Sequence, residues 1–251
     1  MTDLKTLLQF CDERTRRHSV KDFPGSMNGL QMANNGKVTR IGAAVDAGLE
    51  PFREAAKRGI DFLIVHHGMY WSAPFPLTGV HYEKVKVLMD NNIALYGSHL
   101  PLDCHAEIGN NAILIEKAGM KAVGTFLEYE GNDIGFIAEP NGTRTELRER
   151  LEKLFPRGMV AMEFGSETPQ KIGVLTGSGQ SAVSHLKRNG IDTLITGELK
   201  QQHFNQAQEE GLNLYCCGHY ATETFGVCAL AAEAAEKFGL EWEFIATECP
   251  L

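Results

Sequence analysis

An internal repeat constrains the fold of this chain more than any other feature of its sequence. Residues 41–65 and 172–196 align without a gap, and eight of the 25 aligned residues are identical. The identities include glycine pairs at 42/173 and 48/179 and the Gly-Ile-Asp turns at 59–61 and 190–192. Backbone geometry restricts the choice of residue at such positions. A structural unit that occurs twice therefore explains the agreement better than chance.

Each copy of the repeat predicts a strand, a helix and a second strand. The two strands are continuous apolar runs, which is typical of strands buried on both faces of a mainly parallel sheet. A glycine closes each predicted helix. The predicted ranges are 41–45, 49–57 and 62–65 in the first copy and 172–176, 180–187 and 193–196 in the second. The sequence therefore predicts an α/β protein made of two pseudo-repeated α/β halves with mixed, mainly parallel sheets.

The resemblance between the halves continues beyond the second strand. Residues 93–99 resemble residues 213–219, and both stretches end in a histidine, His99 or His219. An acidic residue follows four positions later in each case, Asp103 or Glu223. The stretch between the second strand and this histidine is longer in the first copy than in the second, and we assign the additional residues to a loop at 69–77.

We place the boundary between the halves near residue 125, which gives domains 1–125 and 126–251. The connecting segment 126–168 is included in the second half. It is predicted to hold a strand at 134–138, a helix at 143–155 and a strand at 159–164. The pair Thr143 and Glu146 forms a capping box that would start this helix.

Composition excludes several classes of protein. The net charge is −8 and no stripe of lysine or arginine is present, which argues against a nucleic-acid partner. No apolar run approaches the roughly 20 residues that a membrane span needs, and the N-terminus does not resemble a targeting signal. The six cysteines form no C-x-x-C pair, which favours reduced thiols and a cytoplasmic location.

Histidines and carboxylates follow the predicted strands at their carboxyl ends, where ligands bind in parallel α/β sheets. No lysine or arginine stands among them, which favours divalent cations. Two adjacent imidazoles at a strand end can address two neighbouring metals, and a carboxylate can bridge them. We therefore predict a site for two divalent ions, Zn, Fe or Mn. The predicted ligands are His66, His67, Asp103, His219 and Glu223, with Thr222 capping a helix that Glu223 begins.

Two further residues have roles that the sequence leaves open. His99 is either a ligand or a residue that orients a ligand, and Glu198 aligns with His67 in the repeat. Both are candidate catalytic residues that could carry a proton. The remaining histidines are interpreted as hydrogen-bonded or solvated residues without a metal. They are His18, His81, His105, His185 and His203.

Three weaker signals surround the predicted site. The glycine-rich turn at 176–182 either binds phosphate or only allows the backbone to turn after the strand. The pair Cys216 and Cys217 is interpreted as buried thiols, with a soft accessory metal ligand as the alternative. Trp71 and Phe75 could form a wall or lid of the site, or could pack in the core or at a contact between subunits.

Four stretches of the chain resemble the signature motifs of the Nif-three-like proteins, which are also named GTP cyclohydrolase 1 type 2 homologues or dinuclear-metal-centre proteins. The stretches are LIVHHGMYWS, SHLPLDCHAEIGNN, TGELKQQHF and GHYATETFG, and the resemblance begins at the NGLQ stretch at 28–31. It implies a two-domain α/β subunit, a toroidal homohexamer and a two-metal site facing the interior. By motif it places the metal ligands on the five residues predicted above.

Two functions are compatible with this site. The first is a metal-dependent hydrolase that uses a metal-bridging hydroxide on a small-molecule substrate, in a GTP cyclohydrolase-like ring opening or a related hydrolysis. The alternative is a non-catalytic hexamer that binds or stores metal or acts as an adaptor. In that alternative Glu198 would have no chemical role.

Overall fold

The computed structural model describes residues 1–71 and 75–251. The chain divides into two compact units. Unit 1 comprises residues 1–102 and 226–248, and unit 2 comprises residues 103–225 and 249–251. Within the described ranges, no helix combines the length and the apolar character needed to cross a lipid bilayer. None of the cysteines in these ranges forms a disulfide.

Unit 1 is built on a five-stranded sheet whose order is β13-β4-β5-β6-β2. Strands β13, β4, β5 and β6 run parallel, and β2 is antiparallel to β6 at the edge. The bounds are β2 (Gly29–Met32), β4 (Arg40–Asp46), β5 (Phe62–His67), β6 (Ala94–Gly97) and β13 (Glu241–Phe244). A separate antiparallel pair joins β1 (Thr2–Asp3) to β3 (Lys37–Val38).

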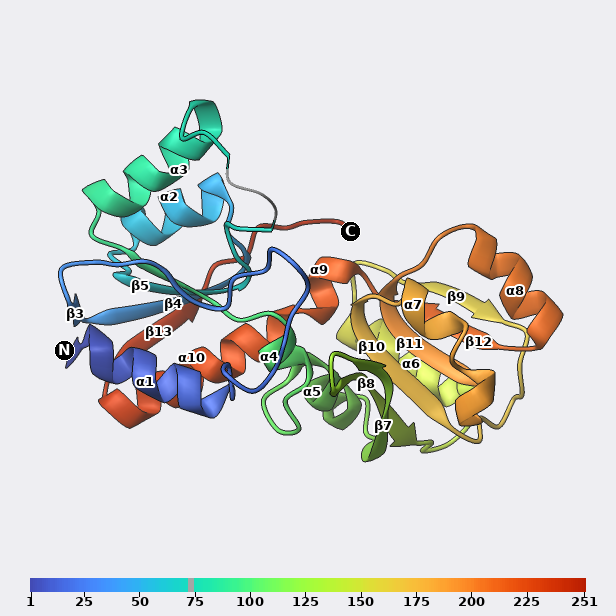
Figure 1. Cartoon of the computed structure of the whole chain (residues 1–251). Coiled ribbons are helices and arrows are strands. Elements are labelled where there is room, and N and C mark those ends of the chain that lie inside the picture. Colours follow the sequence, from blue (N-terminus) through green and yellow to red (C-terminus); the bar gives the residue numbers. More distant parts are fainter. Residues whose placement is uncertain (72–74) are drawn as a thin grey trace. The chain divides into compact units, whose positions relative to one another are not determined.

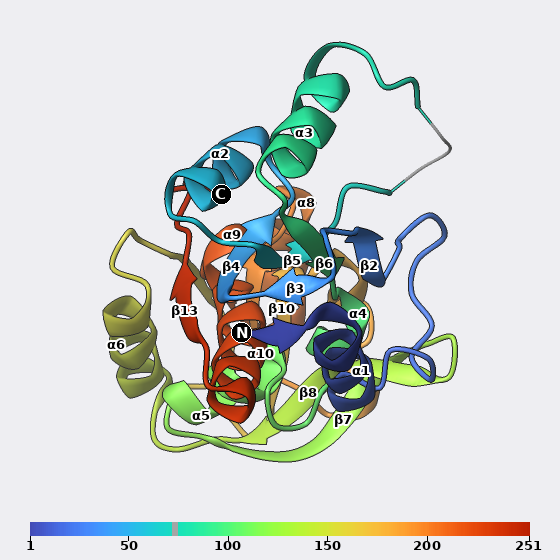
Figure 2. The same ribbon diagram turned by 90° about the vertical axis from the view of Figure 1, so that its left-hand side faces the viewer.

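Helices cover both faces of the unit 1 sheet, which explains why its central strands are apolar throughout. Helices α2 (Leu49–Lys57) and α3 (Gly79–Asp90) lie on one face, and α1 (Leu4–Arg14) and α10 (Thr224–Phe238) lie on the other (Figures 1 and 2). The core under α2 and α3 includes Phe52, Leu63 and Leu88, all fully buried. The short helix α4 (Leu100–Asp103) follows β6.

Unit 2 is built on a six-stranded sheet whose order is β7-β8-β10-β11-β12-β9. Its centre, β10 to β12, is parallel, whereas β7, β8 and β9 join by antiparallel pairing. The strand bounds are β7 (Lys121–Tyr129), β8 (Asn132–Glu139), β9 (Val160–Glu163), β10 (Ile172–Ser178), β11 (Thr193–Glu198) and β12 (Asn213–Cys216).

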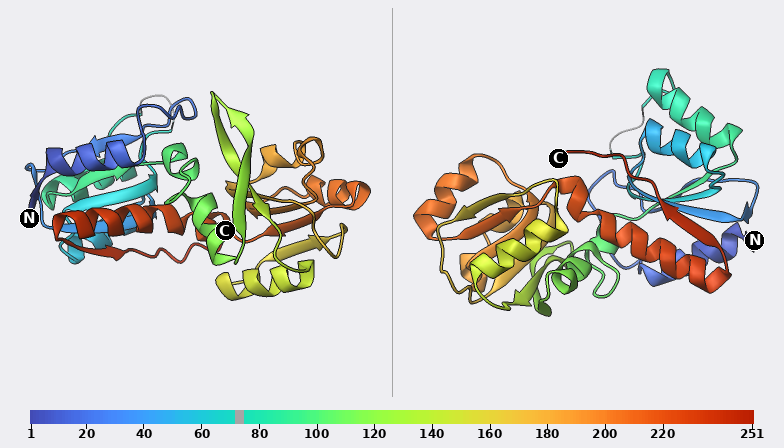
Figure 3. Two further views of the ribbon diagram at one scale, coloured as in Figure 1. Left: turned by 90° about the horizontal axis from the view of Figure 1, so that it is seen from below. Right: turned by 180° about the vertical axis from the view of Figure 1, so that it is seen from behind.

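Helices also cover both faces of the unit 2 sheet. Helices α5 (Asn110–Lys117) and α6 (Arg144–Leu154) pack their apolar side chains on one face. Helices α7 (Gln180–Val183) and α8 (Gln202–Glu210) lie on the other face (Figure 3). The short helix α9 (His219–Thr222) follows β12 in this unit.

The predicted repeat is confirmed as two parallel β-α-β elements, β4-α2-β5 and β10-α7-β11. The second helix is shorter than predicted: α7 ends at Val183, and a 3-10 turn, η1 (Lys187–Asn189), follows. Serines at 181 and 184 and a β-branched valine between them favour the helix less than the alanines and charged residues of α2 do. The capping box of Thr143 and Glu146 is present at the start of α6.

The division at residue 125 differs from the observed one for two reasons. Residue 125 lies inside β7, and the pairing of β7 with β8 holds both sides of that point in unit 2. The chain then returns to unit 1 after Phe225, because β13 pairs with β4 at the edge of the first sheet. The repeat does not extend to these terminal elements, so it could not assign them.

Candidate metal centre

Three histidines of unit 1 lie together where β5 and β6 end. His66 and His67 are the last residues of β5, and His99 follows β6 after a single serine. The ring centroid of His66 lies 4.9 Å from those of both His67 and His99, and the latter two centroids are 5.7 Å apart. One nitrogen from each imidazole lies within 4.8 Å of the other two. These three residues form what we call the histidine cluster.

Each ring of the histidine cluster is held at Nδ1 by an oxygen atom. The distances are 3.0 Å to the Ser98 carbonyl from His66, 2.9 Å to the Asp46 carboxylate from His67, and 2.8 Å to the Asp22 carboxylate from His99. Carbonyl and carboxylate oxygens can only accept, so Nδ1 carries the proton in all three rings. In the neutral form of each imidazole the lone pair is therefore at Nε2, the arrangement found in metal-binding histidines.

Asp22 is a functional candidate that sequence reasoning missed. Its carboxylate also accepts hydrogen bonds from the Asn28 side chain at 2.8 Å and from the backbone N–H groups of Phe23 and Leu100. Burial alone would raise the pKa of Asp22, but the hydrogen bonds and the charge of His99 outweigh it and lower this pKa to about 2. The one signal in the sequence that could have pointed to Asp22 was its hydrogen-bond partner Asn28, the first residue of the NGLQ stretch.

Gln31, the last residue of the same stretch, fixes the turn after β5. Its side-chain oxygen accepts a hydrogen bond from the Met69 N–H at 2.7 Å. A Cβ on Gly68 would lie 2.0 Å from the Gln31 amide nitrogen, and a Cβ on Gly97 would lie 2.6 Å from it. Both glycines are therefore required for the close approach of Gln31, which holds the backbone beside the histidine cluster.

Trp71 forms a wall beside the histidine cluster. Its ring lies 4.8 Å from that of His99 and 5.5 Å from that of His67, and its Nε1 donates to the Gly68 carbonyl. Phe75 instead stacks on His81, with centroids 3.9 Å apart. Of the two residues predicted to form a wall of the site, Trp71 is therefore the one that lies beside the histidine cluster. Residues 72–74 of the loop at 69–77 lie outside the described ranges.

In unit 2, His219 stands between two carboxylates. Its Nδ1 lies 3.1 Å from Glu198 at the end of β11, and its Nε2 lies 3.3 Å from Glu223, which is only 3% exposed. The hydrogen bond with Glu223 raises the pKa of His219 against the effect of burial, and with the contribution of Glu198 this pKa reaches about 9. The two acidic groups favour positive charge at this point, which is also what a bound cation requires.

The glycine-rich turn after β10 packs against His219 and Glu223. Gly177 has a φ of +66°, and a Cβ there would lie 2.1 Å from a carboxylate oxygen of Glu223. A Cβ on Gly197 would lie 2.7 Å from the Cα of His219. These glycines therefore have a packing role beside His219 and Glu223, and phosphate binding by this turn stays a prediction.

The prediction that Thr222 caps a helix beginning at Glu223 is wrong. Thr222 is the last residue of α9, and its hydroxyl lies 2.9 Å from the Gly218 carbonyl and 3.0 Å from that of His219. The same hydroxyl accepts a hydrogen bond from Gly177 N–H at 3.0 Å. Thr222 thus ties α9 to the glycine-rich turn.

Asp103 is buried in unit 2 and belongs to a network of polar side chains. Its carboxylate accepts a hydrogen bond from Asn110 at 2.8 Å and lies 3.5 Å from the Thr176 hydroxyl. Asn111 donates to the Asp103 carbonyl and accepts from the Thr176 N–H. Asp103 therefore contacts Thr176, and Glu223 packs on the neighbouring residue Gly177, both at the carboxyl end of β10.

The predicted site residues fall into two groups, one in each unit. His66 and His67 lie with His99 in unit 1. Asp103, His219 and Glu223 lie with Glu198 in unit 2. The remaining histidines make local contacts, such as the hydrogen bond from the Lys200 N–H to His203 and the pairing of His185 with Arg188.

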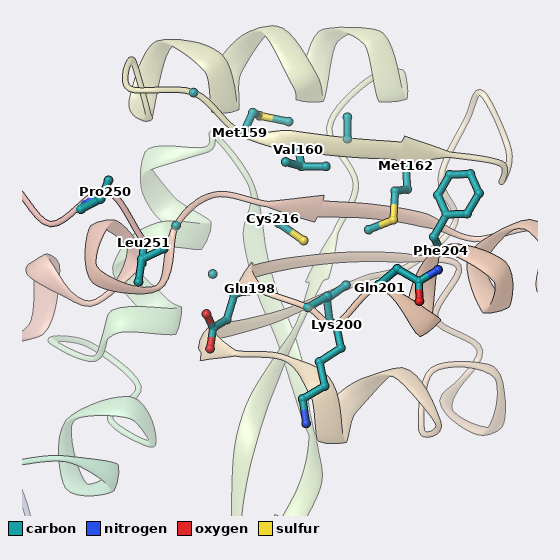
Figure 4. A pocket seen from close by; sticks show the side chains of 15 residues that line it. Met159, Val160, Met162, Glu198, Lys200, Gln201, Phe204, Cys216, Pro250 and Leu251 are labelled. Atoms are coloured by element: carbon teal, nitrogen blue, oxygen red, sulfur yellow. The ribbon is translucent and has the colours of Figure 1, made fainter.

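Unit 2 also contains a largely apolar pocket of about 870 Å³, shown in Figure 4. Side chains from β9, β12 and α8 line it, including Met162, Cys216 and Phe204. Glu198, Lys200 and Gln201 stand at its wall and bring polar groups to a largely apolar lining (Figure 4). Because Glu198 also pairs with His219, the pocket adjoins the proposed ligands of this unit.

Comparison with known proteins identifies the family. The profile of the DUF34/NIF3 family (NGG1p interacting factor 3) matches residues 2–250. The chain belongs to the DUF34/NIF3 family. A Deinococcus radiodurans relative named GTP cyclohydrolase 1 type 2 homolog is 38% identical over 225 residues, 88% of this chain and 84% of that protein. An Archaeoglobus fulgidus protein of the same name is 36% identical over 243 residues, 97% of each chain.

Solved structures of DUF34/NIF3 relatives have the same α/β architecture with mixed sheets. TTHA1606 from Thermus thermophilus is 36% identical, with a TM-score of 0.88, and protein ybgI is 33% identical, with a TM-score of 0.92. Both matches cover the whole of both chains. HcgD from Methanocaldococcus jannaschii is 27% identical, with a TM-score of 0.85 over 97% of each chain. The predicted fold class and family are thereby confirmed.

Proposed function

We propose that this DUF34/NIF3 protein is a metal-dependent hydrolase with two divalent ions per subunit. The proposed ligands are His66, His67, Asp103, His219 and Glu223. The observation that carries the proposal is the orientation of the imidazoles: Nδ1 of His66, His67 and His219 each faces an oxygen acceptor. Imidazoles oriented in this way offer Nε2 to a metal ion in their neutral form, and together with buried carboxylates they are ligands that suit Zn, Fe or Mn. On His219 a bound cation would take the place of the proton that Glu223 and Glu198 otherwise favour.

Two such ions, when bound, lower the pKa of water toward neutrality and polarise an electrophilic carbon or phosphorus. The protein itself contributes the handling of protons. Glu198 is well placed to accept one, because its carboxylate is 45% exposed and contacts both His219 and the apolar pocket. His99 is the corresponding candidate in unit 1, with its Nδ1 proton held by Asp22.

The pocket and the names of the relatives support a class of substrate to test. Several relatives carry the name GTP cyclohydrolase 1 type 2 homolog, which supports ring opening of a purine nucleotide as a reaction to test. The apolar lining around Met162 and Phe204 would hold the apolar or aromatic part of a small molecule beside Glu198. Phosphoesters and amides with such a group are the other substrates to test.

The experiment combines metal analysis with turnover. Purified protein loaded with Zn, Fe or Mn is assayed against nucleotides, phosphoesters and amides, and the metal-to-chain ratio is measured by elemental analysis. We expect about two ions per chain and turnover that Glu223→Gln abolishes with the loss of at least one ion. Glu236→Gln, an exposed position in α10, is the control. Full metal occupancy in Glu223→Gln would contradict the role of Glu223, and high metal affinity without turnover would favour a storage or adaptor protein.

We also propose that the protein assembles as a homohexamer, on the strength of its family resemblance. Apolar side chains on α3 support self-association, because Val80 is 50%, Tyr82 55% and Met89 67% exposed. Light scattering coupled to size-exclusion chromatography tests this proposal. A monomeric mass at micromolar concentration would contradict it.

A further inference from the structure

We propose that the outer edge of β9 and the apolar pocket beside it bind an extended peptide with apolar side chains at alternate positions. In this proposal the peptide adds an antiparallel strand to the unit 2 sheet next to β9, and one of its apolar side chains enters the pocket. The proposal goes beyond the hydrolase, because binding of the peptide needs neither a metal ion nor turnover.

The backbone of β9 is oriented to pair with a further strand. β9 is the last strand in the sheet order, and among the described strands it pairs only with β12. The Phe164 N–H donates to the Leu212 carbonyl, and residues in an antiparallel pair alternate between facing the partner and facing away. Ala161 and Glu163 therefore turn their backbone groups outward. The Glu163 carbonyl accordingly lies 3.4 Å from Arg144, and the exposed Ala161 presents both its N–H and its C=O.

A group of apolar side chains lies beside this edge. Val160, Met162 and Phe164 occupy alternate positions and therefore share one face of the strand. Val160 is 62% and Phe164 37% exposed. Phe204 of α8 is 45% exposed, and its ring lies 5.4 Å from that of Phe164. Exposed apolar side chains gathered in this way mark a surface that binds a partner.

The pocket gives the edge a place for a side chain. Its volume of about 870 Å³ is within the range of roughly 300–1,000 Å³ found for ligand pockets. Val160 and Met162 line it from β9, together with Cys216, which pairs with Val160 across the two strands (Figure 4). Opposite residues of an antiparallel pair share a face. A side chain opposite Val160 or Met162 on the added strand would therefore lie on the face that holds the pocket.

The pocket already contacts a peptide segment of the same chain. Pro250 and Leu251 form part of its wall, and the Leu251 carbonyl accepts a hydrogen bond from the Tyr220 N–H at 2.9 Å. An apolar segment whose backbone is hydrogen-bonded to unit 2 is thus compatible with this lining. We infer that a second such segment, placed on β9, would find the same surroundings.

The opposite edge of the sheet is protected against pairing, whereas β9 is not. Strand β7 begins with Lys121 and has an irregular register between Ala122 and Gly124, both of which discourage an added strand. Strand β9 reads VAME and pairs with β12 in regular register, and its charged residue Glu163 binds Arg148. Because β9 has only four residues, backbone pairing is short and the pocket must supply much of the affinity.

The test uses short fluorescent peptides in which threonine alternates with leucine, methionine, valine or phenylalanine. Fluorescence polarisation measures their binding to the metal-free full-length protein with a chelator present. When the apolar side chains face the pocket, the threonine N–H groups face β9 and the N–H groups of the apolar residues face away. N-methylation of the threonines should therefore abolish binding, and N-methylation of the apolar residues should leave it unchanged.

Protein variants locate the peptide on β9. Val160→Asp should lower the affinity for the peptide that binds best by about 10-fold or more, because it places a charge in the apolar lining. Val123→Asp is the matched control, since Val123 is 56% exposed on the other edge strand, β7, and should leave the affinity unchanged. Circular dichroism melting verifies that both variants are folded. Amide hydrogen exchange followed by NMR should show new protection of the Ala161 N–H when the peptide binds.

The outcomes separate this proposal from the proposed function. Absence of saturable binding by all of the peptides would overturn the peptide site, as would equal affinity of the two N-methylated forms. If no peptide binds but Val160→Asp lowers the oligomeric mass measured by light scattering, the edge belongs to a second copy of the chain, which also overturns the proposal. Peptide binding without any turnover would contradict only the hydrolase.

Discussion

The Nδ1 atom of His99 lies 2.8 Å from Oδ1 of Asp22, a residue 77 positions earlier in the chain. Both side chains are largely buried, 11% and 5% exposed respectively. The contact joins the segment before β2 to the end of β6, and Asn28 reinforces it by accepting from the His99 N–H at 2.7 Å. The orientation of a candidate metal ligand thus depends on a loop that contains no obvious metal-binding motif.

Asp22 should make the stability of the metal-free protein sensitive to acid. Its pKa is lowered in the folded state to about 2 from an ordinary 3.8, so it stabilises the fold above pH 3.8 and this stabilisation is lost as the pH falls toward 2. The contribution is about 2 kcal/mol. Urea unfolding between pH 6 and 2, with a chelator present, measures it.

Asp22→Asn should remove this part of the pH dependence and lower the free energy of unfolding at pH 6. Asp90→Asn, an exposed carboxylate that pairs with Lys86 in α3, is the control and should follow the wild-type curve. Identical pH profiles for Asp22→Asn and the wild type would show that the contact with His99 does not stabilise the folded state.

Gly177→Ala should damage the unit 2 ligands. The substitution adds a Cβ 2.1 Å from the Glu223 carboxylate at a residue whose φ is +66°, so Glu223 must move. We expect a loss of about 1–2 kcal/mol from the backbone alone, together with weaker metal binding. Gly59→Ala is a matched control, because its φ is +67° and no atom lies within 4 Å of the added Cβ. Equal metal affinity in both variants would argue against packing of Gly177 on Glu223.

Asn110→Ala should weaken metal binding through Asp103. Asn110 is fully buried and donates to the Asp103 carboxylate at 2.8 Å. Its loss should lower metal affinity by about 10–100-fold and stability by about 1–3 kcal/mol. Isothermal calorimetry with Zn²⁺ measures the first effect and urea unfolding the second. Asn141→Ala removes an exposed hydrogen bond to Gly119 and should leave the affinity unchanged.

Cys216 and Cys217 should react slowly with iodoacetamide in the folded protein at pH 8. Burial raises the pKa of Cys216 to about 11 and that of Cys217 to about 12, so little thiolate is present. Mass spectrometry after timed alkylation should show both thiols modified only in urea. Cys216 lines the pocket. Its rapid reaction in the native protein would indicate a nearby cation and would favour the alternative in which Cys216 is an accessory metal ligand.

The elements that the repeat covers were predictable, because their strands are buried on both faces and their turns need glycine. The β4-α2-β5 element follows the predicted ranges closely. The histidines at its end lie near His99, and their role as ligands stays a prediction. Asp22 was not predictable, since a single acidic residue in a loop has no spacing that indicates a contact 77 positions away. The apolar pocket was missed for a similar reason: Met162, Phe204 and Cys216 come from three separate elements.

Unit 1 is discontinuous in sequence, and this affects the order in which the chain can fold during translation. Strand β13 forms the edge of the first sheet beside β4, yet about two hundred residues separate them. Residues 103–225 leave the ribosome as one continuous stretch, so unit 2 can become nearly complete while unit 1 still lacks a strand and most of a helix. One edge of β4 therefore stays unpaired in the nascent chain until residues 241–244 have been synthesised.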